Sequence, residues 1–311
     1  MTEAWLDPAA WLILLPLAWA SLAFLAGPGR GGRLAIPALA LQCALAFGLA
    51  VEMIDSGARV HAVGGWGAPL GIDLMADGLA TVMLLLTQAV ALAMAVYAQA
   101  YFTEAHHRAE ATWFWPLAGF LIAAMNALFL SADLFNLYVT LELLGLAAVG
   151  LVALGGGTAQ LSAALRYLLV SLVASGAYLM GVALIYGTYG TVSLATLAPL
   201  IGEDAPLATW LAAGLMLAGL MAKTALFPFH TWLPPAHGGA PAPVSALLSA
   251  LVVKASFYLV LRLWLAPFAP MAETAAWLAG GLGAAAIVWG SWQALRTQHI
   301  KRCLLYTSPS P

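Results

Sequence analysis

Long apolar runs separated by short polar segments dominate this chain of 311 residues. A membrane-spanning helix needs about 20 mostly apolar residues in a row, and nine stretches fit that length. The expected spans are 9–26, 34–54, 78–101, 113–131, 134–154, 163–189, 207–228, 243–265 and 273–295. These runs are too continuous for the short alternating strands of a membrane β-barrel. The pattern therefore predicts an all-α polytopic membrane protein.

The segments outside the spans are too short or too polar to form a separate folded domain. The longest, 55–77, is rich in glycine and has too few apolar residues for a core, so we expect no soluble domain. Segment 191–200 is apolar but short, and predicts a small helix at the membrane surface. The first apolar run follows Glu3 and Asp7 instead of the positive residues of a signal peptide, so we interpret it as a span.

Composition agrees with a membrane protein and excludes several classes of enzyme and cofactor site. Hydrophobic residues make up 63% of the chain and charged residues 8%, against about 25% charged in soluble domains, which excludes a soluble enzyme. Cys43 and Cys303 are too few for a disulfide framework or a cysteine metal site. No phosphate-binding loop, dinucleotide fingerprint or paired-histidine haem motif occurs. We therefore expect no cofactor and no metal in this chain, and energy from an ion gradient or a partner subunit. The net charge of −2 says nothing about nucleic acid, and we expect none among the partners.

Positive residues gather on one side of the expected topology, which is the side that faces the cytoplasm in a cell membrane. That side holds Arg30, Arg33, Arg108, Arg166, Arg296, Lys301 and Arg302, whereas the other side is mostly acidic, with Arg59 and Arg262 as positive exceptions. We therefore expect the N-terminus outside and the segment 296–302 inside.

Ionisable residues within the spans are functional candidates, because a charge in the bilayer is costly. Glu142 lies near the middle of span 134–154. It is either a protonated carboxyl bound by a neighbouring helix, or a proton-relay carboxylate that can pair with a buried lysine. Lys223 lies in span 207–228, five residues before the helix-breaking Pro228. Broken helices mark ion sites in transporters, and the alternative is a lysine that extends to the interface.

Lys254 and His230 complete the candidate proton path. Lys254 lies near the middle of span 243–265. Desolvation disfavours the charged form of a buried lysine, and a nearby carboxylate favours it. A lysine whose carboxylate partner moves can therefore load and release a proton, and Glu142 with Lys223 would supply such a pair. His230 suits proton transfer between lysines, because neutral imidazole both accepts and donates. It serves equally well as a structural histidine at the break.

Several other polar residues are weaker candidates, because packing or solvation explains them as well as chemistry does. They are His237, Thr224, Ser245 and Ser249 near the candidate path, Asp133 and Asn136 at a span edge, and His106 and His107 in a polar loop.

Four segments together resemble the proton-conducting antiporter-like membrane family. They read DLFNLYVTLELL, AKTALFPFHTWLPPAH, APVSALLSALVVKASFYLVLR and HIKR, within a similarity from about residue 60 to 302. The family includes antiporter-like subunits of respiratory complex I (NADH:quinone oxidoreductase), subunits of membrane-bound hydrogenases, and large subunits of Mrp-type cation/proton antiporters. The segment GGWGAPLGIDLMADGLATVMLL is most similar to the D-type subunit of Mrp antiporters.

The resemblance implies a role for each candidate. Glu142 matches the essential acid of the fifth helix, Lys223 the lysine of the broken seventh helix and Lys254 the central lysine of the eighth. His230 matches a histidine after the break that is associated with the proton path in relatives. The implied fold has fourteen helices, of which two inverted five-helix repeats each form a half-channel.

The resemblance also implies a division of the chain. We expect N-terminal helices in 1–112, the first five-helix repeat in 113–265, and helix nine with the start of the second repeat in 266–302. After HIKR the chain reads CLLYTSPSP instead of the apolar start of a tenth helix. We therefore interpret 303–311 as a truncated or non-native tail.

Three hypotheses about function follow. In the first, the chain is a proton-translocating subunit of a multisubunit antiporter that exchanges Na⁺ or K⁺ for protons. In the second, it pumps protons in a redox complex, either complex I or a membrane-bound hydrogenase. In the third, it is a non-conducting scaffold. In the first two, other membrane subunits, protons and the bilayer are the partners.

Overall fold

The computed structural model describes residues 7–27, 29–68, 71–103 and 108–296. Within these ranges nine helical segments are long and apolar enough to cross a membrane, and each corresponds to one of the expected spans. The all-α polytopic prediction is thereby confirmed. The expected tail 303–311 and the pair His106 and His107 lie outside the described residues. The chain divides into two compact units, Met1–Gly155 with Pro241–Val252, and Gly156–Ala240 with Val253–Pro311.

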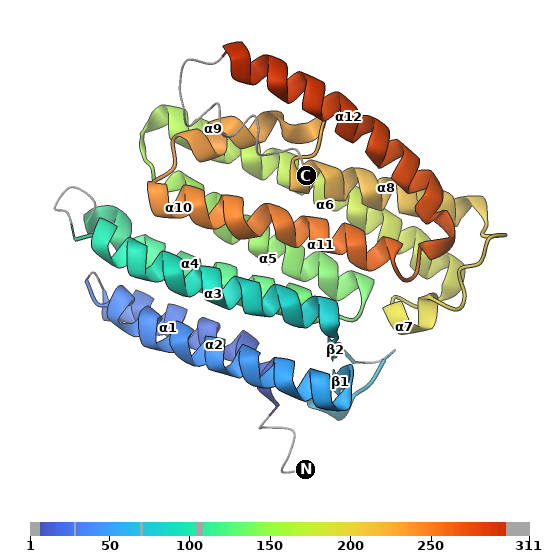
Figure 1. The fold of residues 1–311 in the computed structure, drawn as a ribbon, viewed down its shortest axis with the longest axis horizontal. Helices are drawn as coiled ribbons and strands as arrows, with labels where there is room; N and C mark the ends of the chain where they lie inside the picture. The colour runs from blue at the N-terminus through green and yellow to red at the C-terminus, as the bar shows by residue number, and fades with distance from the viewer. Residues whose placement is uncertain (1–6, 28, 69–70, 104–107, 297–311) are drawn as a thin grey trace. The chain divides into compact units, whose positions relative to one another are not determined.

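The first unit is a helical bundle with a small hairpin (Figure 1). Its elements are α1 (Pro8–Ala26), α2 (Gly31–Ser56), β1 (Arg59–Ala62), the 3₁₀ turn Val63–Gly65, β2 (Asp73–Ala76), α3 (Gly78–Tyr101), α4 (Arg108–Leu130), α5 (Leu134–Ala153), α10 (Ala242–Leu247) and the π-helical turn Leu248–Val252. Helix α1 packs on α2 and α4, α2 on α3, and α4 on α5. The antiparallel pair β1–β2 lies in segment 55–77, which the sequence predicts to have no core of its own.

Neutral polar side chains are buried inside the first unit. The Gln88 side chain on α3 donates to the Asn126 Oδ1 on α4 at 2.8 Å, and Asn126 donates to the carbonyl of Leu12 on α1 at 2.6 Å. Gln42 on α2 is fully buried, and its amide has no hydrogen-bond partner among the described residues. The contacts of Gly32 with Gln99 and of Gly78 with Met53 set the antiparallel register of α2 and α3. That register places Gln42 at the level of Gln88.

The second unit is built on two long helices that pack closely (Figure 1). Its elements are α6 (Gly157–Tyr189), α7 (Leu194–Leu197), α8 (Leu207–Thr224), the 3₁₀ turn η4 (Phe229–Trp232), α9 (Leu233–Gly238), α11 (Val253–Trp264), the 3₁₀ turn Ala269–Met271 and α12 (Ala272–Arg296). Helix α8 packs on α6 and α11. A Cβ on Gly219 of α8 would lie 2.4 Å from the carbonyl oxygen of Ala174 on α6, so only glycine permits this approach. The short helix α7 lies where segment 191–200 predicted one.

Candidate functional site

The expected break in the seventh span lies at the end of α8. Helix α8 ends at Thr224, and Ala225 takes the left-handed conformation with φ 57° before the chain continues into η4 and α9. The sequence predicts the break at Pro228, but the helix ends four residues earlier, at Thr224. A helix end at this depth leaves backbone carbonyls without partners inside the helix. One of them, the carbonyl of Ala222, accepts a hydrogen bond from the Trp232 indole at 2.9 Å.

Lys223 lies in the last turn of α8 and is 7% exposed. The negative end of the helix dipole stabilises a cation at this position. The preceding turn is close to α6, because Gly219 lies one turn before Lys223 and contacts the α6 backbone. The lysine is therefore fixed on a helix end whose position two packed helices determine.

His230 lies in η4 and is buried. Its ring stacks on Phe227 with centroids 5.6 Å apart, and its Nδ1 has no hydrogen-bond partner within the described part of the chain. Next to it, Trp232 stacks on Tyr167 of α6 at 4.2 Å, almost parallel. Aromatic packing thus holds η4 and the imidazole of His230 in place.

Helix α9 is also held by α6. The Gln160 side chain donates to the carbonyl of Ala236 at 3.0 Å. His237 is 2% exposed and lies with its ring edge-on to Trp232. The weaker candidate His237 is therefore a core residue of the broken stretch, and not a loop residue.

Lys254 lies in the first turn of α11, directly after the π-helical turn Leu248–Val252. It is exposed on the surface of the described chain, in contrast to Lys223. π-Helical turns are rare and occur frequently at functional sites. The sequence predicted an uninterrupted helix here, because a π turn has no distinct residue signature.

Arg262 is a buried cation that the sequence reasoning missed. It lies near the end of α11, is 5% exposed, and its guanidinium lies 5.8 Å from the centre of the Tyr258 ring. From the sequence, Arg262 is only a positive exception on the acidic side of the expected topology. The signal that marks it is its position inside the apolar run YLVLRLWL, with a tyrosine one turn before it.

Glu142 lies near the middle of α5 in the first unit and is half-buried. The structure therefore brings Lys223 and His230 into one broken stretch of the second unit, with Lys254 on another helix of that unit. The carboxyl candidate lies in the other unit. Among the described residues no cluster of three or more histidine, cysteine, aspartate or glutamate side chains is arranged to hold a metal ion.

Asp133 and Asn136 form the start of α5. The Asp133 carboxylate accepts a hydrogen bond from the Asn136 backbone at 2.6 Å and caps the helix, and the Asn136 side chain donates to the Ser131 hydroxyl at 2.7 Å. Burial raises the pKa of Asp133, with a smaller rise from the Asp73 charge, and the helix amides oppose both. The two residues have a structural role that the sequence left open.

The broken helix and its flanking segments match a known family. Residues 131–310, more than half of the chain, match the family described as NADH:quinone oxidoreductase/Mrp antiporter, TM. The chain belongs to this family. The matched region contains Glu142, Lys223, His230 and Lys254, and it confirms the family resemblance that the four sequence segments indicated.

Relatives within the family have two kinds of name. The chain is 36% identical to NADH-quinone oxidoreductase subunit N of Desulforudis audaxviator, over 96% of this chain and 60% of that protein. It is also 36% identical to the D-type subunit of the Na(+)/H(+) antiporter of Alkalihalophilus pseudofirmus, over 69% of this chain and 43% of that protein. A member of the Mrp complex from Dietzia sp. DQ12-45-1b has a similar structure, with TM-score 0.88 and 27% identity over 100% of this chain and 57% of that one. The chain thus spans about half of these family members.

Proposed function

We propose that this chain is a proton-translocating subunit of a multisubunit membrane antiporter that exchanges Na⁺ or K⁺ for protons. The observation that carries this proposal is Lys223, a buried lysine in the last turn of a spanning helix that breaks at membrane depth. A buried cation at this depth is expensive, so it has to do something that a neutral side chain cannot. Binding and releasing a proton is such a task.

The proposed path uses the candidate residues in distinct roles. Lys223 binds a proton and is stabilised in its charged form by the carbonyl end of α8. Glu142 supplies the negative charge whose approach or retreat changes the proton affinity of the lysine. His230 passes protons along the broken stretch, using the ring nitrogen that has no partner within the described residues. Lys254, after the π turn, is the next proton-binding group.

A second candidate function is proton pumping inside a redox complex, NADH:quinone oxidoreductase or a membrane-bound hydrogenase. The observation that favours it is the similarity to NADH-quinone oxidoreductase subunit N, which extends over almost the whole chain. The same residues would then move protons, driven by electron transfer in other subunits.

The placement in the membrane is part of the proposal. We infer a multi-pass protein of the cell membrane, with the N-terminus outside and the Arg-rich segment 296–302 on the cytoplasmic side. Residues 113–265 would form the first five-helix repeat of an antiporter-like fold. The remaining membrane subunits of the complex would be its partners.

One experiment tests the function and separates the two candidates. The intact complex is purified from its native membrane, its subunits are identified by mass spectrometry, and visible and EPR spectra are recorded. The complex is then reconstituted in vesicles with a pH-sensitive dye. We expect a colourless complex of small hydrophobic subunits in which added Na⁺ or K⁺ dissipates a pH gradient. Flavin or iron–sulfur signals with peripheral subunits would identify the redox pump instead. A complex that moves protons under neither condition would contradict both.

A further inference from the structure

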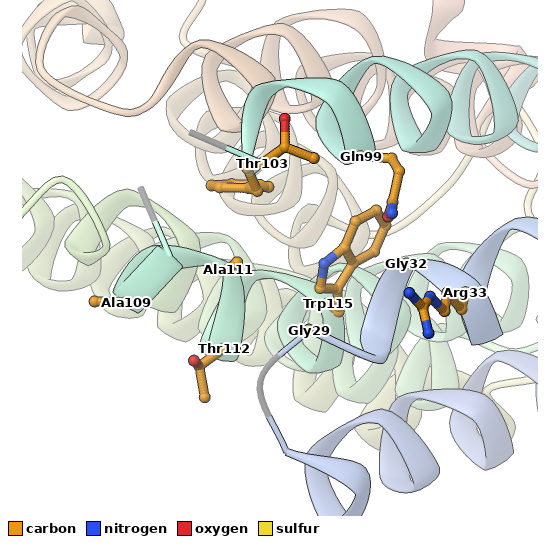
Figure 2. A pocket seen from close by; sticks show the side chains of 10 residues that line it. Gly29, Gly32, Arg33, Gln99, Thr103, Ala109, Ala111, Thr112 and Trp115 are labelled. Carbon is orange, nitrogen blue, oxygen red and sulfur yellow. The ribbon is translucent and has the colours of Figure 1, made fainter. Parts of the chain in front are cut away.

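A cavity of about 770 Å³ opens at one end of the first unit, far from the candidate proton path in sequence. Its walls come from the beginning of α2, the end of α3 and the beginning of α4 (Figure 2). The polar side chains in the wall are Arg33, Gln99, Thr103 and Thr112, and the apolar ones include Phe102 and Trp115. Glu142, Lys223, His230 and Lys254 do not line it.

The cavity wall favours a negatively charged ligand. Among the described lining residues Arg33 is the charged side chain, and the Gln99 amide adds hydrogen-bond donors, whereas the Thr103 hydroxyl already donates to the Ala100 carbonyl. Helices α2 and α4 both begin here, so two positive dipole ends face the cavity and one negative end, that of α3, opposes them. The first turn of α2 has no side-chain cap, because its N-cap residue Arg30 makes no capping hydrogen bond. Amides of such an uncapped turn bind anions.

The same wall has an apolar part that a free inorganic ion would not use. Phe102 and Trp115 are 6% and 5% exposed, and Phe102 packs on Phe114 with ring centroids 4.8 Å apart. The cavity wall therefore combines Arg33 and Gln99 with aromatic side chains, and Figure 2 shows Trp115 beside Gln99 and the start of α2. It lies at the ends of three membrane spans, which is the depth of lipid headgroups. Basic cavities between spans bind anionic headgroups at this depth.

We propose that this cavity binds a phosphate-bearing anion, and that the anion is the headgroup of an anionic phospholipid. The phosphate lies at Arg33 and the uncapped start of α2, and the glycerol and upper acyl chain lie against Phe102 and Trp115. The site would make the first unit bind anionic phospholipids in preference to zwitterionic ones. This proposal does not depend on the proposed transport function.

The test compares two arginines at the same helix end. Arg33→Gln removes the charge that lines the cavity, whereas Arg30→Gln removes an equal, exposed charge three residues away that does not line it. The full-length protein is purified in its complex, and phosphatidylglycerol and phosphatidylcholine bound per protein are measured by mass spectrometry after exchange in mixed vesicles. We expect Arg33→Gln to lower bound phosphatidylglycerol about tenfold, as for loss of a charge-assisted hydrogen bond. Arg30→Gln should lower it by no more than about fivefold, the general attraction of one surface arginine.

A second variant covers the case in which Arg33→Gln does not assemble. Thr103→Trp keeps every charge and narrows the cavity at its exposed edge, so it should also reduce the phosphatidylglycerol bound per protein.

Inorganic phosphate added as a competitor identifies the source of the phosphate. If it leaves the lipid bound, the ligand is the headgroup, and if it displaces the lipid fully, the site takes free phosphate. Equal losses from Arg33→Gln and Arg30→Gln, or equal retention of phosphatidylcholine and phosphatidylglycerol, would overturn the proposal.

Discussion

Both units of the chain bury neutral polar side chains, but they differ in the basic side chains that they bury. The described part of the first unit buries neutral groups, such as Gln42, Gln88 and Asn126, and the carboxyl of Glu142 is half-buried near the middle of a span. Every buried lysine, arginine or histidine within the described residues lies in the second unit. These are Lys223, His230, His237 and Arg262.

We interpret the neutral buried groups of the first unit as structural and the buried basic residues of the second unit as functional. Neutral groups in the first unit form hydrogen bonds from helix to helix, as in the chain from Gln88 to Asn126 to the Leu12 carbonyl. In membranes such bonds contribute only about 0.6 kcal/mol each on average, and they need no charge. Buried ionisable groups can cost several times more. In the second unit Lys223, His237 and Arg262 lie in the last turns of α8, α9 and α11, and His230 lies in the 3₁₀ turn η4. The costly groups are therefore located at helix ends and in a turn.

The test with the largest expected effect removes one buried polar group from each unit. We expect Lys223→Ala to reduce proton transport about a hundredfold or more, because a positioned proton-transfer group contributes at least that much. Gln88→Leu should lower the melting temperature and leave transport per assembled complex unchanged. Both are measured in reconstituted vesicles after subunit composition has been checked. Transport that survives Lys223→Ala would remove the lysine from the path, and loss of transport in assembled Gln88→Leu would remove the distinction between the units.

The next test asks whether Lys254 carries protons or only charge. Arginine does not deprotonate in proteins, so Lys254→Arg keeps the charge and removes the proton exchange. We expect about a hundredfold loss of transport. Arg166→Lys is the matched control, because Arg166 is also exposed on a helix of the second unit and has no proposed proton role. Normal transport in Lys254→Arg would show that a fixed charge is sufficient.

The third test moves the helix that positions Lys223. Gly219→Ala places a Cβ 2.4 Å from the Ala174 carbonyl oxygen, which forces α8 away from α6 at a cost of about 1–3 kcal/mol. We expect a lower melting temperature and a partial loss of transport. Gly214→Ala is the control in the same helix, since nothing lies within 4 Å of its Cβ position, and it should stabilise α8 by up to about 1 kcal/mol. Equal effects of the two variants would contradict the role of close packing.

Much of the fold could be predicted because hydropathy reports whether a segment prefers lipid. All nine spans follow from it, and Pro228 adds the expected interruption after Lys223. Hydropathy does not report which side of a helix is covered, so it could not predict that Arg262 is buried and Lys254 exposed on the same helix, α11. At the end of α8 the Trp232 indole donates to the Ala222 carbonyl, a contact across the break that no local pattern contains. The hairpin β1–β2 likewise pairs residues that hydropathy does not relate.

The smallest expected effect concerns the start of α5, outside the spans. Burial raises the pKa of Asp133 above its ordinary value of 3.8, so the folded state binds this proton more tightly than the unfolded state. The resulting stability is fully present below the ordinary pKa and is lost as the pH rises through the raised one. Asp133→Asn keeps the helix cap and removes the buried charge. We therefore expect it to raise the melting temperature slightly at pH 7 and to leave it unchanged at acidic pH.

The cap itself is isolated by Asp133→Ala, which should destabilise the protein by about 1 kcal/mol because the Asn136 amide loses its acceptor. Melting temperatures of the three proteins are compared across the acidic to neutral range in one detergent. If the wild type gained stability over Asp133→Asn as the pH rises, the carboxylate would be stabilised in the folded state, and burial would not be the dominant influence. In that case the capping hydrogen bonds would outweigh burial, and Asp133 would stabilise the start of α5 as a charged cap.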